Sequence, residues 1–244
     1  MESHLSKFQK SIIVLFNILL AVLLIWSITY TLMTSSRFYR YEFAKQNVTA
    51  RTGFTELQLE IIGDHIIDYL IDEKESLQIQ INGESVFSIQ AIKHMEDVKA
   101  LFLGIQNVLW YAFVIFVVIG IYLYVKRKEI KKYFFKVNLI VFISLVSLFI
   151  IIGLFILINF DNAFNVFHRL IFWDEQSYRD SFFSDTSNYA HLEEPGIDNR
   201  MLVKILPMGL FSDAAAIIVI GSIVILGIIT LVLFINNRRS KRIA

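Results

Sequence analysis

Long apolar blocks without charge dominate the pattern of hydrophobic and polar positions along this chain. A helix needs about 20 apolar residues to cross the hydrocarbon core of a bilayer, whereas a helix in a soluble core rarely runs that long without a polar face. The pattern therefore predicts four membrane-spanning helices, at residues 11–33, 101–125, 137–160 and 214–237. The first block is longer than the apolar region of a cleaved signal peptide, so we expect it to be retained.

The longer of the two polar segments between these blocks, residues 34–100, carries mixed signals. Apolar residues at three-to-four spacing predict a helix with Thr55 as its N-cap. Alternating residues around Asn82–Gly83 predict a β-hairpin, and a polar helix should follow and run into the second span. Close to the first span we expect four aromatic residues in the headgroup layer, namely Phe38, Tyr39, Tyr41 and Phe43.

The second polar segment, residues 161–213, begins with an amphipathic stretch around residues 160–171 that should lie along the membrane interface. Pro207 should interrupt the chain just before the fourth span.

Positive charge gathers in three places: the N-terminus, residues 126–136 between the second and third spans, and the tail 238–244. Short segments rich in Lys and Arg stay in the cytoplasm, which explains these residues without a nucleic-acid or lipid partner. Both termini are therefore predicted to be cytoplasmic, and both polar segments to lie outside. The expected fold is a mainly α membrane protein with four transmembrane helices and a small mixed α/β extracytoplasmic domain built from the two outer segments.

The composition of the chain and the motifs it lacks exclude several kinds of functional site. The chain has no cysteine, so disulfides, a thiol nucleophile and cysteine metal sites are excluded. It also lacks the phosphate loop of ATPases, the H-E-x-x-H sequence of zinc proteases and the G-x-S-x-G sequence of serine hydrolases. None of the four blocks contains Asp, Glu, Lys, Arg or His, so no such residue lies at mid-depth of a span, which argues against an ion-coupled transporter.

Two of the five histidines stand about two helical turns from a predicted span: His94 before the second and His168 after the third. Imidazole exchanges protons near neutral pH, and Asp97 follows His94 on the same helical face. A single histidine in such a place ordinarily makes a structural hydrogen bond. Two at matched depth beside charged residues indicate a shared site above the outer leaflet.

Five short sequences along the chain occur in an order typical of one protein family. They are RFYRYEFAKQNV after the first span, DYLIDEKESL, KHMEDVK before the second span, FNVFHRLIF after the third, and IDNRMLVKILP before the fourth. Over essentially its whole length the chain resembles the bacterial lipoprotein intramolecular transacylases. One departure is the polar stretch 174–194, which is longer than the resemblance leads us to expect.

The resemblance implies an acyltransferase of the bacterial cell membrane with its active site at the outer-leaflet face. Such enzymes move the sn-2 acyl chain of a diacylglyceryl-modified lipoprotein to the α-amine of its own N-terminal cysteine, which gives the lyso-form lipoprotein. The essential histidines of the family correspond to His94 and His168. The implied partners are these lipoproteins and membrane phospholipid, with no nucleic acid, ATP, metal or other cofactor.

This reaction suits the residues that the chain has. His94, oriented by Asp97, is the expected general base toward the amine, and His168 the group that stabilises the oxyanion or protonates the leaving oxygen, although either histidine can fill either role. Other residues are expected to have supporting roles. Arg37, Arg40 and Arg169 should support the oxyanion or contact lipid headgroups. Tyr39, Tyr41 and Glu42 should shape the site, and Asp198 should serve the structure.

Two alternatives remain at this point. The first is another lipid-directed membrane enzyme, either a hydrolase or a metal-assisted enzyme, because two histidines with Asp97 are able to ligate zinc. The second is a non-enzymatic membrane sensor or accessory subunit with an outer ligand-binding domain.

Overall fold

In a computed structural model, residues 5–171 and 200–242 are described, without a few side chains near the ends of these ranges. The chain forms two compact units. Unit 1 comprises Met1–Thr29, Asn107–Ile158 and Ala216–Ala244, and unit 2 comprises Tyr30–Gln106 and Asn159–Ala215.

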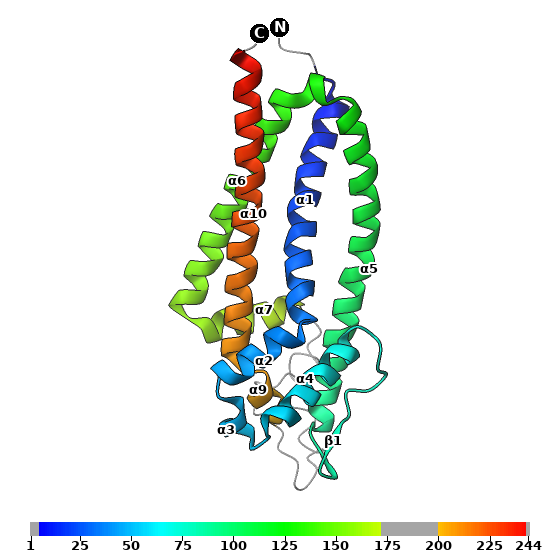
Figure 1. Cartoon of the computed structure of the whole chain (residues 1–244), viewed down its shortest axis with the longest axis vertical. Coiled ribbons are helices and arrows are strands. Elements are labelled where there is room, and N and C mark those ends of the chain that lie inside the picture. Colours follow the sequence, from blue (N-terminus) through cyan, green and yellow to red (C-terminus); the bar gives the residue numbers. More distant parts are fainter. Residues whose placement is uncertain (1–4, 172–199, 243–244) are drawn as a thin grey trace. The chain divides into compact units, whose positions relative to one another are not determined.

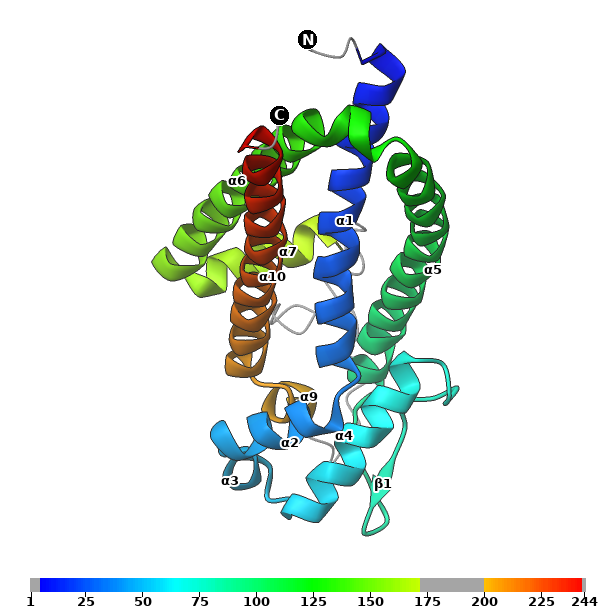
Figure 2. The same cartoon turned by 45° about the horizontal axis from the view of Figure 1, so that its top comes forward.

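Four long helices cross or enter unit 1, and within the described residues these four are long and apolar enough to span a membrane. In unit 1 the start of the first helix, the turn between the second and third, and the end of the fourth lie at the same end (Figure 1, Figure 2). The expected membrane fold with four spans is confirmed. The helices are α1 Lys7–Met33, α5 Ile89–Val125, α6 Arg127–Ile158 and α10 Met208–Arg242.

The basic segment 126–136 differs from the expected loop. Helix α6 already begins at Arg127, so only Lys126 stands between α5 and α6. Lys, Arg and Glu are good helix formers, and the chain turns tightly because the Glu129 amide bonds back to the Lys126 carbonyl at 3.0 Å. The positive charge is therefore held on a rigid helical turn.

Unit 1 is held together at this end by a small apolar cluster. Ile13 of α1, Leu123 of α5, and Ile130 and Val137 of α6 are all buried and pack together. One helical turn further into the unit, Asn17 and Asn138 are also buried.

Within the described residues unit 2 contains several short helices, and some of them begin with a side-chain cap. Ser35 caps α2, Ser36–Lys45, by accepting from the Phe38 amide. Thr55 and Gln58 form a reciprocal capping box at the start of α4, Glu56–Leu70, so the predicted N-cap is confirmed. The remaining short helices are α3 Val48–Thr52, α7 Phe160–Ile171 and α9 Met201–Ile205.

The predicted hairpin is present but short. Strands β1, Gln80–Ile81, and β2, Glu84–Ser85, pair antiparallel. Asn82 and Gly83 between them both have positive φ, 56° and 86°, which is the backbone of a type I′ turn and the reason for the Asn-Gly pair.

The aromatic residues of α2 are placed differently from our expectation. Phe38, Tyr39 and Phe43 are buried, and only Tyr41 is exposed, at 62%. Helix α2 packs on α4, where Gly63 leaves room for the Phe43 ring, because a Cβ at Gly63 would approach it to 3.1 Å. Three of the four side chains therefore build the core of unit 2 and are not exposed to contact lipid headgroups.

Candidate active site

His94 lies near the start of α5, which continues without a break into the second span. Ser88 caps this helix by accepting from the Ala91 amide at 3.3 Å. Ala91 and Met95 bury one face of the turn in unit 2, which leaves His94 half-buried at the edge of that face. Asp97 follows one turn later and is exposed. The local geometry thus holds an imidazole on a rigid helix with a carboxylate nearby on the same helix.

His168 lies in α7, the helix that follows the third span. Asn159 caps this helix: its Oδ1 accepts from the Asn162 amide at 2.9 Å. The His168 side chain is outside the described part of the structure, so its proximity to His94 stays a prediction. Both residues belong to unit 2, and the neighbouring Arg169 is exposed.

Helix α2 carries five of the predicted supporting residues, Arg40 among them, and it divides the other four between two faces. Arg37 and Tyr41 are exposed. Tyr39 and Glu42 are 3% and 1% exposed. Burial raises the pKa of the Tyr39 hydroxyl well above its ordinary value, so this phenol stays neutral and serves packing. Of these four residues, Arg37 and Tyr41 are thus the ones that a bound molecule can reach.

The remaining predicted arginine of α2, Arg40, forms an ion pair with Glu60 of α4. The Nη1 to Oε1 distance is 2.5 Å, and both side chains are substantially exposed. Exposed pairs of this kind contribute about 0–1 kcal/mol. We therefore regard Arg40 as a surface link between α2 and α4.

Glu42 belongs to a polar cluster that the sequence reasoning did not find. Gln46 Nε2 donates to Glu42 Oε2 at 3.3 Å and lies 3.4 Å from Oδ2 of Asp213 in the first turns of α10. Lys45 forms an ion pair with the same Asp213 oxygen. Asp213 directly precedes the uncharged block 214–237, and a carboxylate at the very edge of a span was the signal that could have indicated it.

The electrostatics of this cluster favour a neutral Glu42. Burial is the largest cause that raises the pKa of its carboxyl, and the nearby Asp213 raises it further, while Gln46 and Lys45 oppose them. Among the described residues, Glu42 Oε1 has no hydrogen-bond partner. A buried carboxylate oxygen without a partner is costly, so a bound proton relieves the site.

His65, a further histidine of unit 2, has a structural role. Its Nε2 donates to the Leu77 carbonyl at 3.1 Å, and its Nδ1 accepts from Lys74 Nζ at 3.2 Å. This pairing fixes one neutral tautomer. Burial and the Lys74 charge lower the pKa of the ring.

Two further expectations concern residues that the structure does not describe, because they fall outside the described ranges. Asp198 and the stretch 174–194 lie outside them. Within residues 5–171 and 200–242, no group of three or more His, Asp or Glu side chains was found that could hold a metal ion.

Solved structures share this fold. The membrane-integral lipoprotein intramolecular transacylase Lit from Bacillus cereus matches with a TM-score of 0.72 and 23% identity, over 98% of this chain and 100% of that one. A variant of it with a histidine-to-arginine substitution has a TM-score of 0.65 and 23% identity, over 94% and 93% of the two chains. A histidine-to-alanine variant has 0.64 and 22%, over 93% and 94%. A search of curated proteins found no match.

The family model described as "Lipoprotein intramolecular transacylase Lit" matches residues 12–178. This range contains His94, His168 and every predicted supporting residue except Asp198. Because the match covers more than half of the chain, the protein belongs to the lipoprotein intramolecular transacylase family and is an acyltransferase with four membrane-spanning helices.

Proposed function

We propose that this protein moves the sn-2 acyl chain of a diacylglyceryl-modified lipoprotein to the α-amine of the N-terminal cysteine of the same lipoprotein. The product is a lyso-form lipoprotein. The family match over residues 12–178 carries the proposal, and the presence of both histidines in unit 2 supports it.

The chemistry requires little from the enzyme beyond orientation and proton transfer. Converting an ester to an amide is downhill, so ATP is not needed. The nucleophile is the amine of the substrate, so the enzyme needs no serine or cysteine nucleophile. Because donor and acceptor belong to one molecule, correct placement of the two can lower the barrier by several kcal/mol, on the order of 7–11 in the best cases.

We assign His94 as the general base. An α-amine has a pKa of about 8, so a fraction is already neutral at working pH, and His94 takes the proton that the nitrogen loses as it attacks the ester carbon. Asp97, one turn further along α5, orients the imidazole. Its exposed position on a rigid helix supports this role.

We assign His168 to the other end of the reaction. When the tetrahedral intermediate collapses, the bond from carbon to the glyceryl oxygen breaks, and His168 donates a proton to that oxygen or stabilises the oxyanion beforehand. The reverse assignment of the two histidines uses the same groups. In both cases the proton taken from the amine balances the proton given to the alcohol.

Supporting roles follow from exposure. Arg37 and Arg169 are exposed cations that suit an oxyanion or a lipid phosphate. Tyr41 is exposed on α2, the same helix as Arg37, whereas Tyr39 and Glu42 shape the site from within the core. We assign Asp198 a structural role.

We further propose that unit 2 faces the outer side of the bacterial cell membrane, among its phospholipids, and that both termini are cytoplasmic. The start of α1, the α5–α6 turn and the end of α10 lie at one end of unit 1, and each carries Lys or Arg. The positive-inside rule supports a cytoplasmic position for that end.

The test uses a bacterial host that otherwise makes only diacyl lipoprotein. The protein is expressed, and the N-terminal peptide of an abundant lipoprotein is read by mass spectrometry. We expect an N-acylated lyso-form peptide with the wild type and none with His94→Ala or His168→Ala at equal membrane abundance. His65→Gln is the matched control, because it removes a histidine of the same unit that serves the structure.

Three outcomes would reject parts of this proposal. Conversion by both histidine variants would remove the catalytic assignment. Release of free fatty acid without N-acylation would identify a lipid hydrolase. Loss of activity of the purified protein with a chelator, restored by zinc, would favour the metal-assisted alternative.

A further inference from the structure

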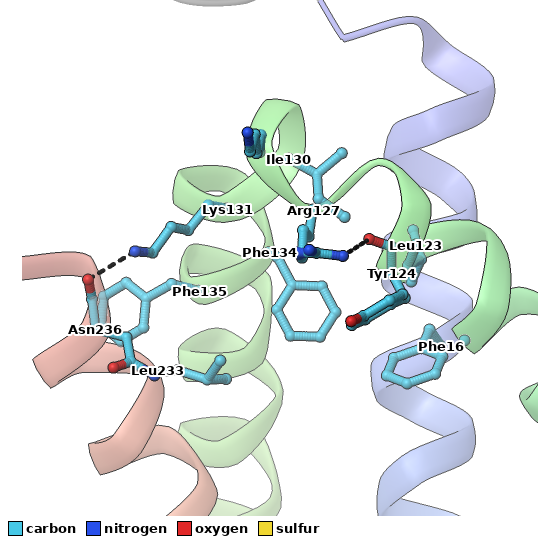
Figure 3. A pocket seen from close by; sticks show the side chains of 12 residues that line it. Phe16, Leu123, Tyr124, Arg127, Ile130, Lys131, Phe134, Phe135, Leu233 and Asn236 are labelled. Atoms are coloured by element: carbon cyan, nitrogen blue, oxygen red, sulfur yellow. Dashed lines mark hydrogen bonds between the residues drawn. The ribbon is translucent and has the colours of Figure 1, made fainter. Parts of the chain in front are cut away.

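Unit 1 contains a cavity of about 630 Å³ at the end where α5 turns into α6. Residues of α1, α5, α6 and α10 line it (Figure 3). Pockets that hold small molecules in proteins measure about 300–1,000 Å³. Every lining residue belongs to unit 1, whereas the catalytic candidates His94 and His168 belong to unit 2.

The inner walls of this cavity are apolar and aromatic. Phe16, Phe134, Phe135 and Leu233 project toward it from three helices (Figure 3). Gly120 leaves room for the Phe16 ring on the α5 side of the cavity, because a Cβ at this position would meet the ring at 3.3 Å. These surfaces suit a hydrocarbon chain.

The mouth of the cavity is basic. Arg127, Lys128 and Lys131 line it from the first turns of α6. Arg127 is held in place, because its Nη1 donates to the Tyr124 carbonyl at 3.1 Å and its guanidinium lies 4.1 Å from the Tyr124 ring centre. Lys131 Nζ donates to the Asn236 carbonyl of α10 at 2.7 Å, as Figure 3 shows.

Two of the basic residues at the mouth, Arg127 and Lys128, have no carboxylate partner among the described residues. No Asp or Glu lines the cavity. Within the described residues Arg127 and Lys128 form no ion pair, while their neighbour Lys126 lies 3.5 Å from Glu129. An anion at this mouth would therefore meet Arg127 and Lys128 with no carboxylate among the lining residues.

We propose that this cavity binds an anionic phospholipid, with its phosphate at Arg127, Lys128 and Lys131 and one acyl chain against Phe16 and Phe134. Apolar walls below a cationic rim match the two halves of such a lipid. The rim stands where the uncharged blocks of α5 and α6 end, which is the level of the headgroups. Basic pockets between transmembrane helices on the cytoplasmic side bind anionic headgroups in other proteins.

A lipid at this place would also stabilise the protein. It would contact helices that line the cavity at the end where α5 and α6 are joined by a single residue, Lys126. A ligand that binds only the folded state raises the unfolding temperature in proportion to the logarithm of its concentration above Kd. The proposal concerns unit 1 and does not depend on the transacylation mechanism.

Native mass spectrometry of the purified full-length protein in detergent tests the proposal. The probes are phosphatidylglycerol and phosphatidylcholine with identical acyl chains, and glycerol 3-phosphate as the headgroup alone. We expect phosphatidylglycerol to bind at least 10-fold more tightly than phosphatidylcholine. Glycerol 3-phosphate should not displace it, because the apolar walls contribute to its affinity.

Charge variants separate a defined site from general attraction to a basic surface. Arg127→Gln with Lys128→Gln should weaken phosphatidylglycerol binding roughly 10- to 30-fold, since each basic residue near a membrane surface contributes on the order of a fewfold to tenfold. Lys132→Gln with Lys136→Gln removes the same charge from the same segment but does not touch the cavity. This control variant should bind phosphatidylglycerol with an affinity within about twofold of the wild type.

Four results would overturn the proposal. These are equal binding of phosphatidylcholine, displacement by glycerol 3-phosphate, equal loss in the two charge variants, or a dimer of the chain in place of a lipid adduct. If the first charge variant does not fold, the comparison of phosphatidylglycerol with phosphatidylcholine on the wild type still tests the proposal. The Gly120→Leu variant provides a second test. Filling the apolar wall in this way should weaken binding without any change in charge.

Discussion

Gln46 donates a hydrogen bond to the buried Glu42 carboxyl at 3.3 Å, and through the same amide it reaches Asp213 of α10. The Gln46 amide occupies space that is open only because residue 209 is glycine, since a Cβ there would overlap it. One turn of α2 and the start of the fourth long helix are thus joined within unit 2 by a small polar cluster. Its residues are Glu42, Lys45, Gln46 and Asp213.

The Gly209→Ala variant should lose this arrangement. The added methyl displaces the Gln46 side chain, which is flexible enough to move away but then leaves Glu42 and Asp213 without their amide partner. We expect a loss of about 1–2 kcal/mol in the free energy of unfolding. In a Gln46→Ala background the same change should cost little, so a double-mutant cycle measured by thermal unfolding in detergent should show coupling of about 1 kcal/mol or more. Additive effects would contradict the described contact.

Glu42→Gln should change how stability depends on pH. The folded-state pKa of Glu42 is raised above its ordinary value of 4.5, so the folded state binds the proton more tightly than the unfolded state. Wild-type stability should then fall as pH rises from about 4.5 through the folded-state pKa. Glutamine cannot lose a proton, so the stability of the variant relative to the wild type should increase as pH rises from 5 to 8. Melting curves across this range measure the difference, and parallel curves would contradict it.

His65 should produce a dependence of opposite sign. Its folded-state pKa is lowered, so its stabilising contribution is present at neutral pH and is lost as pH falls below about 6.5, the value for an unfolded chain. Protonation also ends acceptance from Lys74 at Nδ1. The stability difference between wild type and His65→Gln should therefore shrink between pH 7.5 and pH 5.5. A constant difference would show that the ring does not titrate in this range.

Asn138 should matter for the stability of unit 1. Its Nδ2 donates to Asn17 Oδ1 at 3.0 Å, and its Oδ1 lies 2.8 Å from the Thr230 hydroxyl, so three helices share one buried network. Hydrogen bonds between membrane helices contribute about 0.6 kcal/mol each and up to about 1.7. Asn138→Leu should thus cost about 1–3 kcal/mol, measured as resistance to denaturing detergent. Ser147→Ala, an exposed polar residue of the same helix, is the control and should cost less than about 0.5 kcal/mol.

Asp97→Asn tests the orientation of the proposed base. The substitution keeps the size of the side chain but removes its charge, so it should lower the rate of transacylation by a factor of about 10–100 and leave the protein folded, a smaller loss than removal of the base itself. The pH dependence of the rate should shift as well, because a carboxylate stabilises a protonated imidazole. A merely structural Asp97 would alter the protein yield and leave the pH profile unchanged.

Several features followed from the sequence because their causes are local. The four spans are visible in the chain because transfer of an apolar helix into a bilayer depends mainly on its own composition. The Asn82–Gly83 turn and the Thr55 cap likewise depend on residues within a few positions of each other. The helix that carries both His94 and Asp97 was also predicted from the local pattern, while their joint role in catalysis stays a prediction.

Only the tertiary structure decided which polar and aromatic residues of α2 face the core. The sequence alone placed Phe38, Tyr39 and Phe43 beside the membrane, but packing of α2 against Gly63 of α4 buries them. The contact of Gln46 with Asp213 and the basic-rimmed cavity of unit 1 depend on residues more than 100 positions apart. Hydropathy determines that a helix enters the membrane, because that free energy is a sum over its own residues. Which side chains then meet depends on the shapes of several helices at once, and no single segment contains that information.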